Sequence, residues 1–458
     1  MGLRILLVQA PSVEGPASEI VAPLGLGIVA EAARRAGHTV ELIDLNVIEA
    51  PFAALEKALE RLDPEVVGVG LRNIDPLANR RHSYLPLFAA LLGTVRRKLP
   101  FVPLVVGGAG FSMFAEQIMA RYPAIDIGVV LEGEETFPAL LARLEGGAST
   151  ESVAGLPGTI LRPRREAAVL VSGPRRPRLA RPQLDLPRLW LPAFVAPYLG
   201  KSSYAPAAGV ETKRGCPLGC SYCVYPALQG RRLRFRSPET IVAEVELLHR
   251  EAGVAWVHFT DPVLKLPPEH FRELCLLLRS RKLPVRWTGF FREDTLTPAD
   301  AKLAVSAGCA AFQFSGDGTC DRTLARLRKG FTRDAILQAA RIVAATEALT
   351  VYHFMVNVPG TDEAVARDAA VLVDRLHDIH EPRMNLGAIV FNNLRVYPGT
   401  PLARELADAG RLESTASLLF PTYHDPAPFQ DLRYELEERH QLRACRWLPQ
   451  PGAGERSA

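Results

Sequence analysis

The stretch Thr212–Pro226, TKRGCPLGCSYCVYP, places Cys216, Cys220 and Cys223 in a C-x3-C-x2-C spacing. Three thiolates this close together can bind three irons of a cubane iron–sulfur cluster and leave the fourth iron open to another ligand. Zinc also takes cysteine ligands, but it requires four, and no fourth Cys or His lies within the loop. Three cysteines without a shared metal are the remaining alternative. The stretch therefore predicts a [4Fe-4S] cluster with one open iron.

The same spacing, with the aromatic residue Tyr222 directly before the last cysteine, resembles the motif of the radical S-adenosylmethionine (SAM) superfamily. In that family the open iron binds the amino and carboxylate groups of SAM. The resemblance implies that Tyr222 lies beside the bound cofactor and that the loop follows the first strand of a partial TIM barrel. It also implies a low-potential electron donor of the flavodoxin or ferredoxin type.

Length and composition limit the classes of protein that need to be considered. The 458 residues suit two or three domains, and a net charge of +4 from 54 basic and 50 acidic residues does not suggest a nucleic-acid binder. The N-terminus runs directly into the apolar stretch ILLVQAP, so we expect no signal peptide. No apolar run reaches the ~18 residues that a membrane span needs. Seven scattered cysteines form no disulfide framework, which favours a cytoplasmic protein.

In the first third of the chain, short apolar stretches alternate with helical patterns. This alternation predicts an α/β fold with a doubly wound parallel sheet, here a Rossmann-like domain over residues 1–149. The expected helices are 24–37, 53–62, 87–98 and 115–121. The expected strands are 3–8, 38–44, 64–70, 102–106 and 125–130. Ligands bind such sheets at the carboxyl ends of the strands.

The loops at those carboxyl ends carry glycines and charged residues, although each glycine taken singly is compatible with an ordinary turn. Together the pieces PLGLGIVAEAARRAGHTVELID, VVGGAG and LEGEET resemble the cobalamin-binding domain that precedes many radical SAM barrels. The resemblance covers residues 1 to about 140. It implies that the cofactor is contacted by Leu24, Gly25, Arg72, Gly107, Gly108, Glu132 and Gly133.

This sequence departs from many cobalamin domains because it lacks D-x-H-x-x-G, whose His ligates cobalt from below. The first 150 residues contain only His38 and His82, and neither stands in that context. Arg72 could instead face the cobalt, as an arginine does in the thiopeptide tryptophan methyltransferase subgroup that this chain resembles. A guanidinium has no lone pair to donate, so it would keep the lower position empty. The alternative is that Arg72 pairs with Asp75 at the surface.

After a Pro- and Arg-rich connector over residues 150–206, the strand–helix alternation resumes. Six strand–helix units over residues 207–402 predict a partial (β/α)6 barrel rather than the closed eight of a full TIM fold. The expected helices are 238–251, 268–281, 298–308, 332–346 and 362–379. The expected strands are 209–212, 255–260, 284–290, 310–314, 350–356 and 386–396. Residues 403–458 are expected to form amphipathic helices and, from Pro449, a flexible tail.

Several strand ends acquire a meaning from the resemblance. AFQFSGDG followed by LARLRKGFT resembles the fourth-strand region of cobalamin-dependent radical SAM proteins, which implies that Ser315 and Asp317 contact SAM. Gly318 stands where the family often has Ser, so one hydroxyl contact is in doubt. Asp261 ends the second strand, where many relatives carry a Gly-Gly-Glu for the SAM amine. Asp261 is therefore a candidate for that role, with a helix-capping or ion-paired Asp as the alternative.

The remaining histidines and cysteines carry weaker signals. His258 and His353 alternate with apolar residues in expected strands and can point into the barrel, either as core histidines or as catalytic ones. His424 lies in the C-terminal segment LLFPTYHDP, which resembles the same subgroup. Cys275, Cys309, Cys320 and Cys445 are expected to be structural thiols. No catalytic residue is assigned beyond the cofactor contacts.

A cobalamin domain joined to a radical SAM barrel resembles the class B methyltransferases. The resemblance implies transfer of a methyl group from SAM, via methylcobalamin, to an unactivated carbon or phosphorus of a small-molecule, natural-product or lipid substrate. The route is radical in most relatives and polar in the thiopeptide subgroup. The alternatives are a non-methylating rearrangement or ring formation, a tRNA methylthiotransferase, and a cobalamin or Fe–S sensor. The last two need an RNA-binding domain or an output module that is not evident here.

Overall fold

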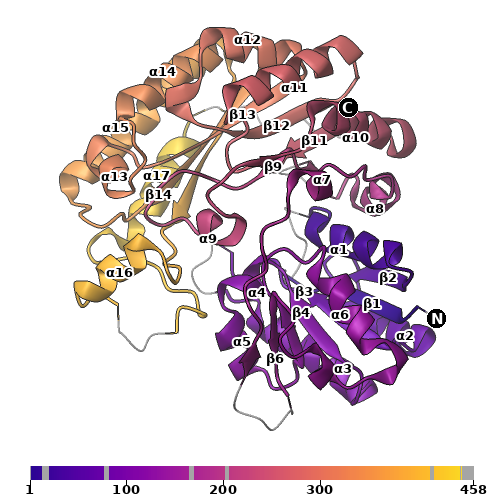
Figure 1. Cartoon of the computed structure of the whole chain (residues 1–458). Coiled ribbons are helices and arrows are strands. Elements are labelled where there is room, and N and C mark those ends of the chain that lie inside the picture. The colour runs from indigo at the N-terminus through magenta and orange to yellow at the C-terminus, as the bar shows by residue number, and fades with distance from the viewer. Residues whose placement is uncertain are drawn as a thin grey trace. The chain divides into compact units, whose positions relative to one another are not determined.

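The computed structural model describes residues 2–12, 20–76, 82–163, 170–201, 206–412, 417–443 and 445, which form two compact units (Figure 1). Unit 1 comprises Met1–Pro76, Arg81–Leu179 and Leu419–Pro421, and unit 2 comprises the rest of the chain. Each unit is built on a parallel sheet, as the alternation of strands and helices predicts.

The sheet of unit 1 has the strand order β2-β1-β3-β4-β5-β6-β7. Its first five strands are parallel, and β6 and β7 add to the edge in antiparallel orientation. The order reverses between β1 and β3, so the loops after these two strands diverge and leave a place where ligands commonly bind. The strands are β1 (Arg4–Gln9), β2 (Thr39–Asp44), β3 (Val66–Gly70), β4 (Leu104–Gly107), β5 (Ile127–Val129), β6 (Thr159–Leu161) and β7 (Val171–Ser172).

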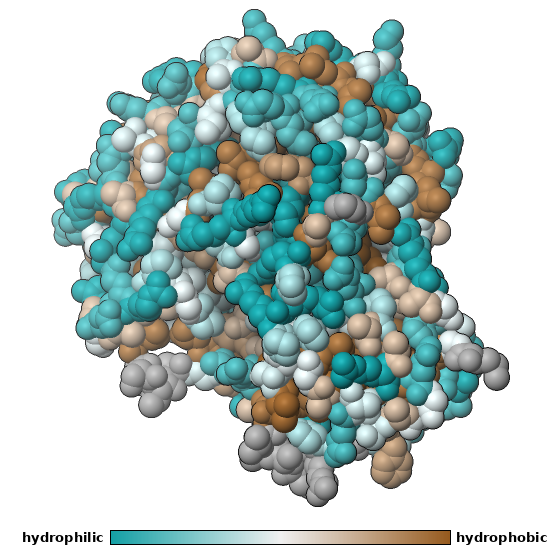
Figure 2. Space-filling model, viewed as in Figure 1, coloured by the Kyte–Doolittle hydropathy of each residue, from teal (hydrophilic) through white to brown (hydrophobic). Residues whose placement is uncertain are grey.

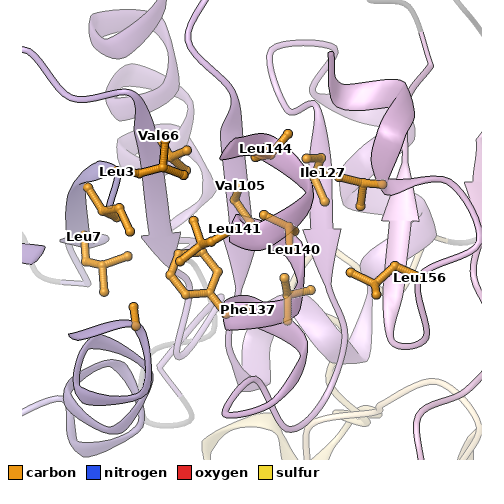
Figure 3. Close-up of a cluster of buried hydrophobic side chains, with 14 of the residues drawn as sticks. Leu3, Leu7, Val66, Val105, Ile127, Phe137, Leu140, Leu141, Leu144 and Leu156 are labelled. Carbon is orange, nitrogen blue, oxygen red and sulfur yellow. The ribbon is translucent and has the colours of Figure 1, made fainter. Parts of the chain in front are cut away.

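Helices of unit 1 pack as two pairs, α1 with α6 and α2 with α3. Helix α2 begins at Pro51, whose fixed φ suits a first helical position, and it ends at Asp63 with a left-handed φ of 44°. Leucine, valine and phenylalanine side chains from the sheet and from α6 form a buried cluster that includes Leu7, Val105 and Phe137 (Figure 3). The helices are α1 (Leu24–Arg35), α2 (Pro51–Leu62), α3 (Leu85–Lys98), α4 (Ala109–Met113), α5 (Ala115–Arg121) and α6 (Thr136–Leu144).

The main sheet of unit 2 has the order β15-β14-β13-β12-β11-β8, and every neighbouring pair is parallel. Among the described residues β8 and β15 do not pair with each other, so the barrel is open, as predicted. Its strands are β8 (Ala208–Val210), β11 (Trp256–Phe259), β12 (Arg286–Phe291), β13 (Cys309–Asp317), β14 (Leu349–Val356) and β15 (Leu386–Asn393). The short strands β9 (Lys213–Arg214) and β10 (Arg234–Phe235) form a separate antiparallel pair.

The helices of unit 2 begin where the sequence provides caps. Ser237, Thr297 and Asp362 each accept a backbone N–H from the first turn of the helix that follows. Figure 1 shows α10, α11, α12, α14 and α15 as an outer layer beside the strands. The helices are α10 (Pro238–Ala252), α11 (Pro268–Arg281), α12 (Pro298–Ser306), α13 (Asp321–Arg326), α14 (Arg333–Ala344), α15 (Glu363–His380), α16 (Pro401–Asp408) and α17 (Leu432–Gln441).

Two segments differ from the expectation for them. The connector over 150–206 is not wholly irregular, because β6 and β7 extend the first sheet and the compact unit reaches Leu179. The same segment also supplies the short helices α7 (Arg181–Leu184) and α8 (Leu191–Val195) to unit 2. In the C-terminal region α16 and α17 are separated by irregular chain, and the expected tail from Pro449 lies outside the described residues. A two-residue strand such as β7 carries too little periodicity to be predicted locally.

In the part of the chain that the structure describes, no helix combines the length and the apolar character needed to cross a membrane. On the face shown in Figure 2, apolar residues are interspersed with hydrophilic ones.

A histidine pair fixes α17 against β15 and α15. His440 Nε2 accepts the backbone N–H of Ile389 at 3.1 Å, so Nδ1 must carry the proton and donate to His377 Nε2 at 2.9 Å. Both imidazoles are therefore neutral. Burial and the neighbouring His440 and Arg443 lower the pKa of His377 to about 4, although Asp374 and Asp378 oppose the shift. Burial also lowers the pKa of His440.

This pair predicts that α17 loosens in acid. A histidine with a lowered folded-state pKa stabilises the fold above its unfolded pKa of ~6.5 and loses that contribution as the pH falls towards ~4. We expect amide-exchange protection of α17 to decrease across this range while that of α10 is retained. His377→Asn cannot take up the proton in this range and should flatten the pH dependence. Unchanged protection of α17 down to pH ~4 would contradict this account.

Candidate functional site

The backbone before the cysteine loop has a conformation that only glycine adopts easily. Gly215 has a φ of 100°, and a Cβ at this position would lie 2.3 Å from the carbonyl oxygen of Arg232. Cys216 N–H then donates to the carbonyl oxygen of Gly230 at 3.0 Å. The β9–β10 pair therefore closes the base of the loop, and the glycine of the motif is required for the close approach of these two chains.

Ser221 attaches the middle of the loop to two distant segments. Its N–H donates to Leu327 O at 2.9 Å, and its hydroxyl donates to Arg326 O at 3.1 Å, at the end of α13. Its own carbonyl oxygen accepts the N–H of Leu402, in the first turn of α16, at 2.9 Å. The loop is thus held by backbone contacts on three sides without use of the cysteine side chains.

The three thiols of the loop are partly to fully buried and are close enough to influence one another electrostatically. Burial raises the pKa of Cys216, and burial with the nearby thiols of Cys220 and Cys216 raises the pKa of Cys223 to about 12. In the described chain no group of three or more His, Cys, Asp or Glu side chains is arranged to hold a metal ion. Zinc takes four Cys or His ligands, whereas a cubane with one open iron takes three cysteines from the protein. The donor set therefore fits a cluster better than zinc.

A β-bulge at the end of β13 sets the orientation of the Asp317 side chain. The register between β13 and β14 shifts between Ser315 and Asp317, and Asp317 has a left-handed φ of 61°. A bulge of this kind redirects a side chain, and a strained non-glycine residue at a strand end is typical of a functional site. Tyr222 O–H donates to Asp317 Oδ2. The structure therefore joins two predicted site residues that are 95 positions apart in the sequence.

Lys329 completes this cluster and was not predicted from the sequence. Its Nζ donates to Asp317 Oδ2 at 2.6 Å and to the carbonyl oxygen of Ser315 at 2.7 Å. Burial lowers the pKa of Lys329, but attraction to Asp317, Cys220 and Glu293 outweighs it and raises the pKa above its ordinary value. Among the described residues Asp317 Oδ1 accepts no hydrogen bond. Lys329 and Tyr222 thus fix one oxygen of Asp317 and leave the other available.

Glu293, two residues after the end of β12, is a second residue that the sequence analysis missed. Its side chain is 3% exposed, and no described group donates a hydrogen bond to Oε1. Burial raises the pKa of Glu293 to about 7, while Lys329 opposes the shift. Nothing in its local sequence, FFREDTL, distinguishes it from a surface carboxylate, because its burial depends on the packing of Gly316 and Phe354 around it.

Asp261 does not have the surroundings expected of a residue that binds the SAM amine. It is 1% exposed, and Oδ1 accepts the N–H groups of Thr212 and Lys213 at 3.0 and 3.1 Å. Oδ2 accepts the Thr212 hydroxyl and Lys213 Nζ, the latter at 3.0 Å. Both oxygens are engaged in holding the strand that leads into the cysteine loop. The geometry therefore supports the ion-paired alternative with a positioning role, and a contact of Asp261 with SAM stays a prediction.

A buried ion network lies on the other side of the same strand. Glu211 pairs with Arg188 and Arg214, both at 2.7 Å, and Arg236 pairs with Glu244 at 2.6 Å. Burial opposes ionisation of Glu211, but Arg214 and Arg188 lower its pKa to about 2. Removing one partner from such a network leaves another charge buried and unpaired. The network ties the segment after Leu179 to the base of the cysteine loop.

In unit 1 Arg72 lies two residues after the end of β3, at the point where the strand order reverses. Its side chain is exposed and makes no ion pair or hydrogen bond with any described residue, so the alternative pairing with Asp75 is not formed. The backbone beneath it is fixed, because Gly110 N–H donates to Leu71 O and Arg72 O at 3.0 and 2.9 Å. Arg72 is thus presented at the ligand-binding edge of the sheet.

Gly108 is required for this arrangement. Its φ is 104°, and a Cβ would lie 2.6 Å from Leu71 O. We expect Gly108→Ala to destabilise unit 1 by ~3 kcal/mol, since it adds a clash to an unfavourable backbone conformation. Gly25→Ala is the matched control: nothing lies within 4 Å of its added Cβ, and alanine favours a helix by up to ~1 kcal/mol. Chemical denaturation would measure both, and equal stability of the two variants would refute the role of Gly108.

The other predicted residues of unit 1 lie at the strand ends with different surroundings. Leu24 and Gly25 open α1, and Gly25 is exposed. Gly107 ends β4. A Cβ added to Gly133 would lie 3.1 Å from a methyl group of Val29. Glu132 Oε2 accepts the N–H of Leu179 at 2.8 Å, so this carboxylate holds the chain at the edge of the unit. Their contact with a cofactor stays a prediction.

The histidines and Cys320 differ in their hydrogen-bond partners, and a catalytic role for His258 or His353 stays open. His258 Nδ1 lies 2.8 Å from the Thr288 hydroxyl, and His353 Nε2 lies 3.3 Å from Gln313 Oε1. Cys320 caps α13 together with Thr323, which accounts for its position after Asp317. His424 is buried, and its Nε2 has no hydrogen-bond partner among the described residues.

Comparison with known proteins agrees with this two-part architecture. Residues 15–141 match the family described as the B12 binding domain, and residues 210–372 match the radical SAM superfamily. Over 431 residues the chain is 26% identical to an uncharacterized methyltransferase of Pyrococcus horikoshii, which covers 93% of this chain and 87% of the relative. Over 356 residues it is 28% identical to the anaerobic magnesium-protoporphyrin IX monomethyl ester cyclase of a Synechocystis strain. This match covers 74% of this chain and 66% of the relative.

The fold is similar to that of a solved radical S-adenosylmethionine methyltransferase, TsrM from Kitasatospora setae, with a tryptophan substrate and a SAM analogue bound. The TM-score is 0.73 and the sequence identity is 22%, and the match covers 95% of this chain and 82% of the solved one. This likeness concerns the fold.

Proposed function

Because the chain belongs to the cobalamin-dependent radical SAM enzymes, we propose that it is a methyltransferase that moves a methyl group from SAM to an unactivated carbon or phosphorus of a small molecule. The observation that carries the proposal is the presence of both family matches, over 15–141 and 210–372, in one chain. The relative from Pyrococcus horikoshii bears the name of a methyltransferase and aligns with nearly the whole chain. A small-molecule substrate agrees with the tryptophan in the solved TsrM structure.

The residues present suit the three cofactors of this family. Cys216, Cys220 and Cys223 would hold the [4Fe-4S] cluster, and Asp317 Oδ1 would accept a hydrogen bond from SAM. Arg72, exposed at the switch point of the first sheet, would face cobalamin without ligating it. When bound, the cluster supplies an electron and an open iron to SAM, and cobalamin supplies a methyl carrier.

The chain's own contribution is to fix these residues before any ligand binds. Ser221 and Asp261 set the backbone of the cysteine loop, and Lys329 with Tyr222 orients the Asp317 carboxylate. Preorganised groups of this kind need no rearrangement when a charged ligand arrives. Tyr222 lies within the cysteine loop and donates a hydrogen bond to Asp317. This bond therefore connects the loop to the residue that would contact the ligand.

A second candidate is a ring-forming reaction without net methylation, which is favoured by the similarity to an anaerobic cyclase. Anaerobic reconstitution with iron, sulfide and hydroxocobalamin, followed by SAM and a flavodoxin- or ferredoxin-type reductant, distinguishes the candidates. S-adenosylhomocysteine with deoxyadenosine would support radical methyl transfer, and S-adenosylhomocysteine alone would support the polar route. Deoxyadenosine alone would favour the cyclase-like reaction. Binding of both cofactors without SAM consumption in the presence of candidate substrates would favour a sensor. Absence of bound cobalamin would overturn the proposal.

A further inference from the structure

The main sheet of unit 2 presents two different faces. Side chains alternate between the faces along each strand, and one face is fully buried. Rings on that face contact one another from strand to strand: Phe291 is tilted against Phe312 at a centroid distance of 4.7 Å, and Phe314 stacks on Tyr352 at 5.7 Å. The buried face is therefore an aromatic core, and it leaves the opposite face to any ligand of the barrel.

The opposite, inner face is partly exposed near the carboxyl ends of the strands. Strand register places its residues side by side, since His258 is opposite Thr288, Phe290 opposite Gln313, and Ser315 opposite His353. The partly exposed side chains of this face are His258, Phe290, Ser315, His353, Met355, Val390 and Asn392.

A row of hydrogen bonds crosses this face over four strands. His258 Nδ1 and Thr288 Oγ1 are 2.8 Å apart, Gln313 Nε2 donates to the same hydroxyl oxygen at 3.4 Å, and His353 Nε2 lies 3.3 Å from Gln313 Oε1. The orientation of the Gln313 amide, with Nε2 towards Thr288 and Oε1 towards His353, determines which atoms of the row donate. His353 Nε2 must carry the proton, which leaves His353 Nδ1 as an acceptor. No described residue donates to it.

The face combines these neutral polar groups with apolar ones and carries no charge. The ring of Phe290 contacts both imidazoles, with centroids 5.8 Å from His258 and 5.3 Å from His353. Up to Ser315 of β13, the described inner positions in the carboxyl halves of β11–β15 include no Asp, Glu, Lys or Arg. Burial lowers the pKa of His353 to about 4, although the Asp317 carboxylate opposes the shift, so the ring is neutral at pH 7. Charged groups begin at Asp317, the last residue of β13, and at its ion-pair partner Lys329.

An uncharged face of this kind discriminates among ligands. An anionic or cationic group placed on it would lose its hydration without gaining a counter-charge, which is costly. A ring or chain with a single N–H or O–H would keep its apolar contacts and satisfy the open acceptor. The division between this face and the charged cluster at Asp317 gives the barrel one neutral and one charged region.

We propose that the inner face formed by Phe290, Gln313 and His353 binds the substrate, and that the substrate part it receives is uncharged, largely apolar, and donates an N–H or O–H to His353 Nδ1. The inference rests on the proposed function and adds the chemical class of the substrate to it.

Indole and 1-methylindole are matched probes, because they share one uncharged ring and differ in the N–H donor. Binding is measured by calorimetry on protein loaded with cluster and cobalamin, with no reductant, after the visible spectrum has shown that both cofactors are present. We expect indole to bind saturably and about fivefold more tightly than 1-methylindole, the effect of one neutral hydrogen bond. Indole-3-carboxylate, which carries a charge, should not compete.

His353→Phe keeps a ring of similar shape and removes the acceptor, so indole and 1-methylindole should bind it equally. His249→Phe, on the helical layer, is the control and should retain the fivefold preference. No saturable indole binding, equal binding of both probes to the unaltered protein, or a preference that survives His353→Phe would each overturn the inference. Failure to load cobalamin or the cluster would instead refute the proposed function, so the two failures are distinguishable.

Discussion

Cys220→Ser is expected to abolish retention of the iron–sulfur cluster and all SAM cleavage that depends on it. Serine has nearly the same size as cysteine, but its hydroxyl ionises far less readily and is a poor ligand for iron. The loop itself should persist, because Ser221 and Gly215 hold it through contacts that do not involve the thiols. Iron content after anaerobic reconstitution should fall from about four atoms per chain to near zero.

The comparison that isolates the ligand effect is Cys445→Ser, which removes one of the chain's free thiols outside the motif. This variant should keep the full iron content and an unchanged visible spectrum. The thermal unfolding of the apo form of Cys220→Ser should match that of the unaltered apo protein. If Cys220→Ser retained the cluster, or if Cys445→Ser lost it, the assignment of the three cysteines as its ligands would be wrong.

Asp261→Asn should destabilise unit 2 by ~3–5 kcal/mol, the range found when a buried ion pair loses one partner. The amide would leave Lys213 Nζ buried without its counter-charge, and it cannot accept all the hydrogen bonds from Thr212 and Lys213. Burial already lowers the pKa of Lys213, and the loss of Asp261 removes the attraction that opposes this shift. Urea denaturation of the apo protein measures the effect without any cofactor.

Asp362→Asn serves as the control for this substitution. Asn caps a helix as well as Asp does, and the ion pair that is lost, with Arg322, is about half exposed, so the cost should stay below ~1 kcal/mol. The opposite result would support the expectation, drawn from the family resemblance, that Asp261 binds the SAM amine. If Asp261→Asn left stability unchanged and weakened SAM binding in calorimetry, Asp261 would contact the cofactor directly.

Much of the fold follows from local patterns in the sequence. Helix α11 has the expected bounds, and the other long helices begin and end within a few residues of the expected positions, because caps, prolines and amphipathic periodicity act over single turns. The α/β fold class and the open six-stranded barrel are likewise confirmed. The short strands β6 and β7 were missed, since two or three residues become a strand only when a neighbouring edge provides hydrogen bonds.

For the candidate site the division is sharper. The sequence by itself determined the cysteine motif, because the spacing of the three cysteines within the eight residues 216–223 does not depend on tertiary packing. It also determined that Arg72 and Asp317 follow strands, and so lie at sheet edges. Only the tertiary structure decided what each carboxylate does: Asp317 keeps one oxygen available beside Tyr222 and Lys329, whereas Asp261 has both oxygens engaged. Strand register and the bulge before Asp317 fix these partners, and both arise from contacts between segments far apart in the chain.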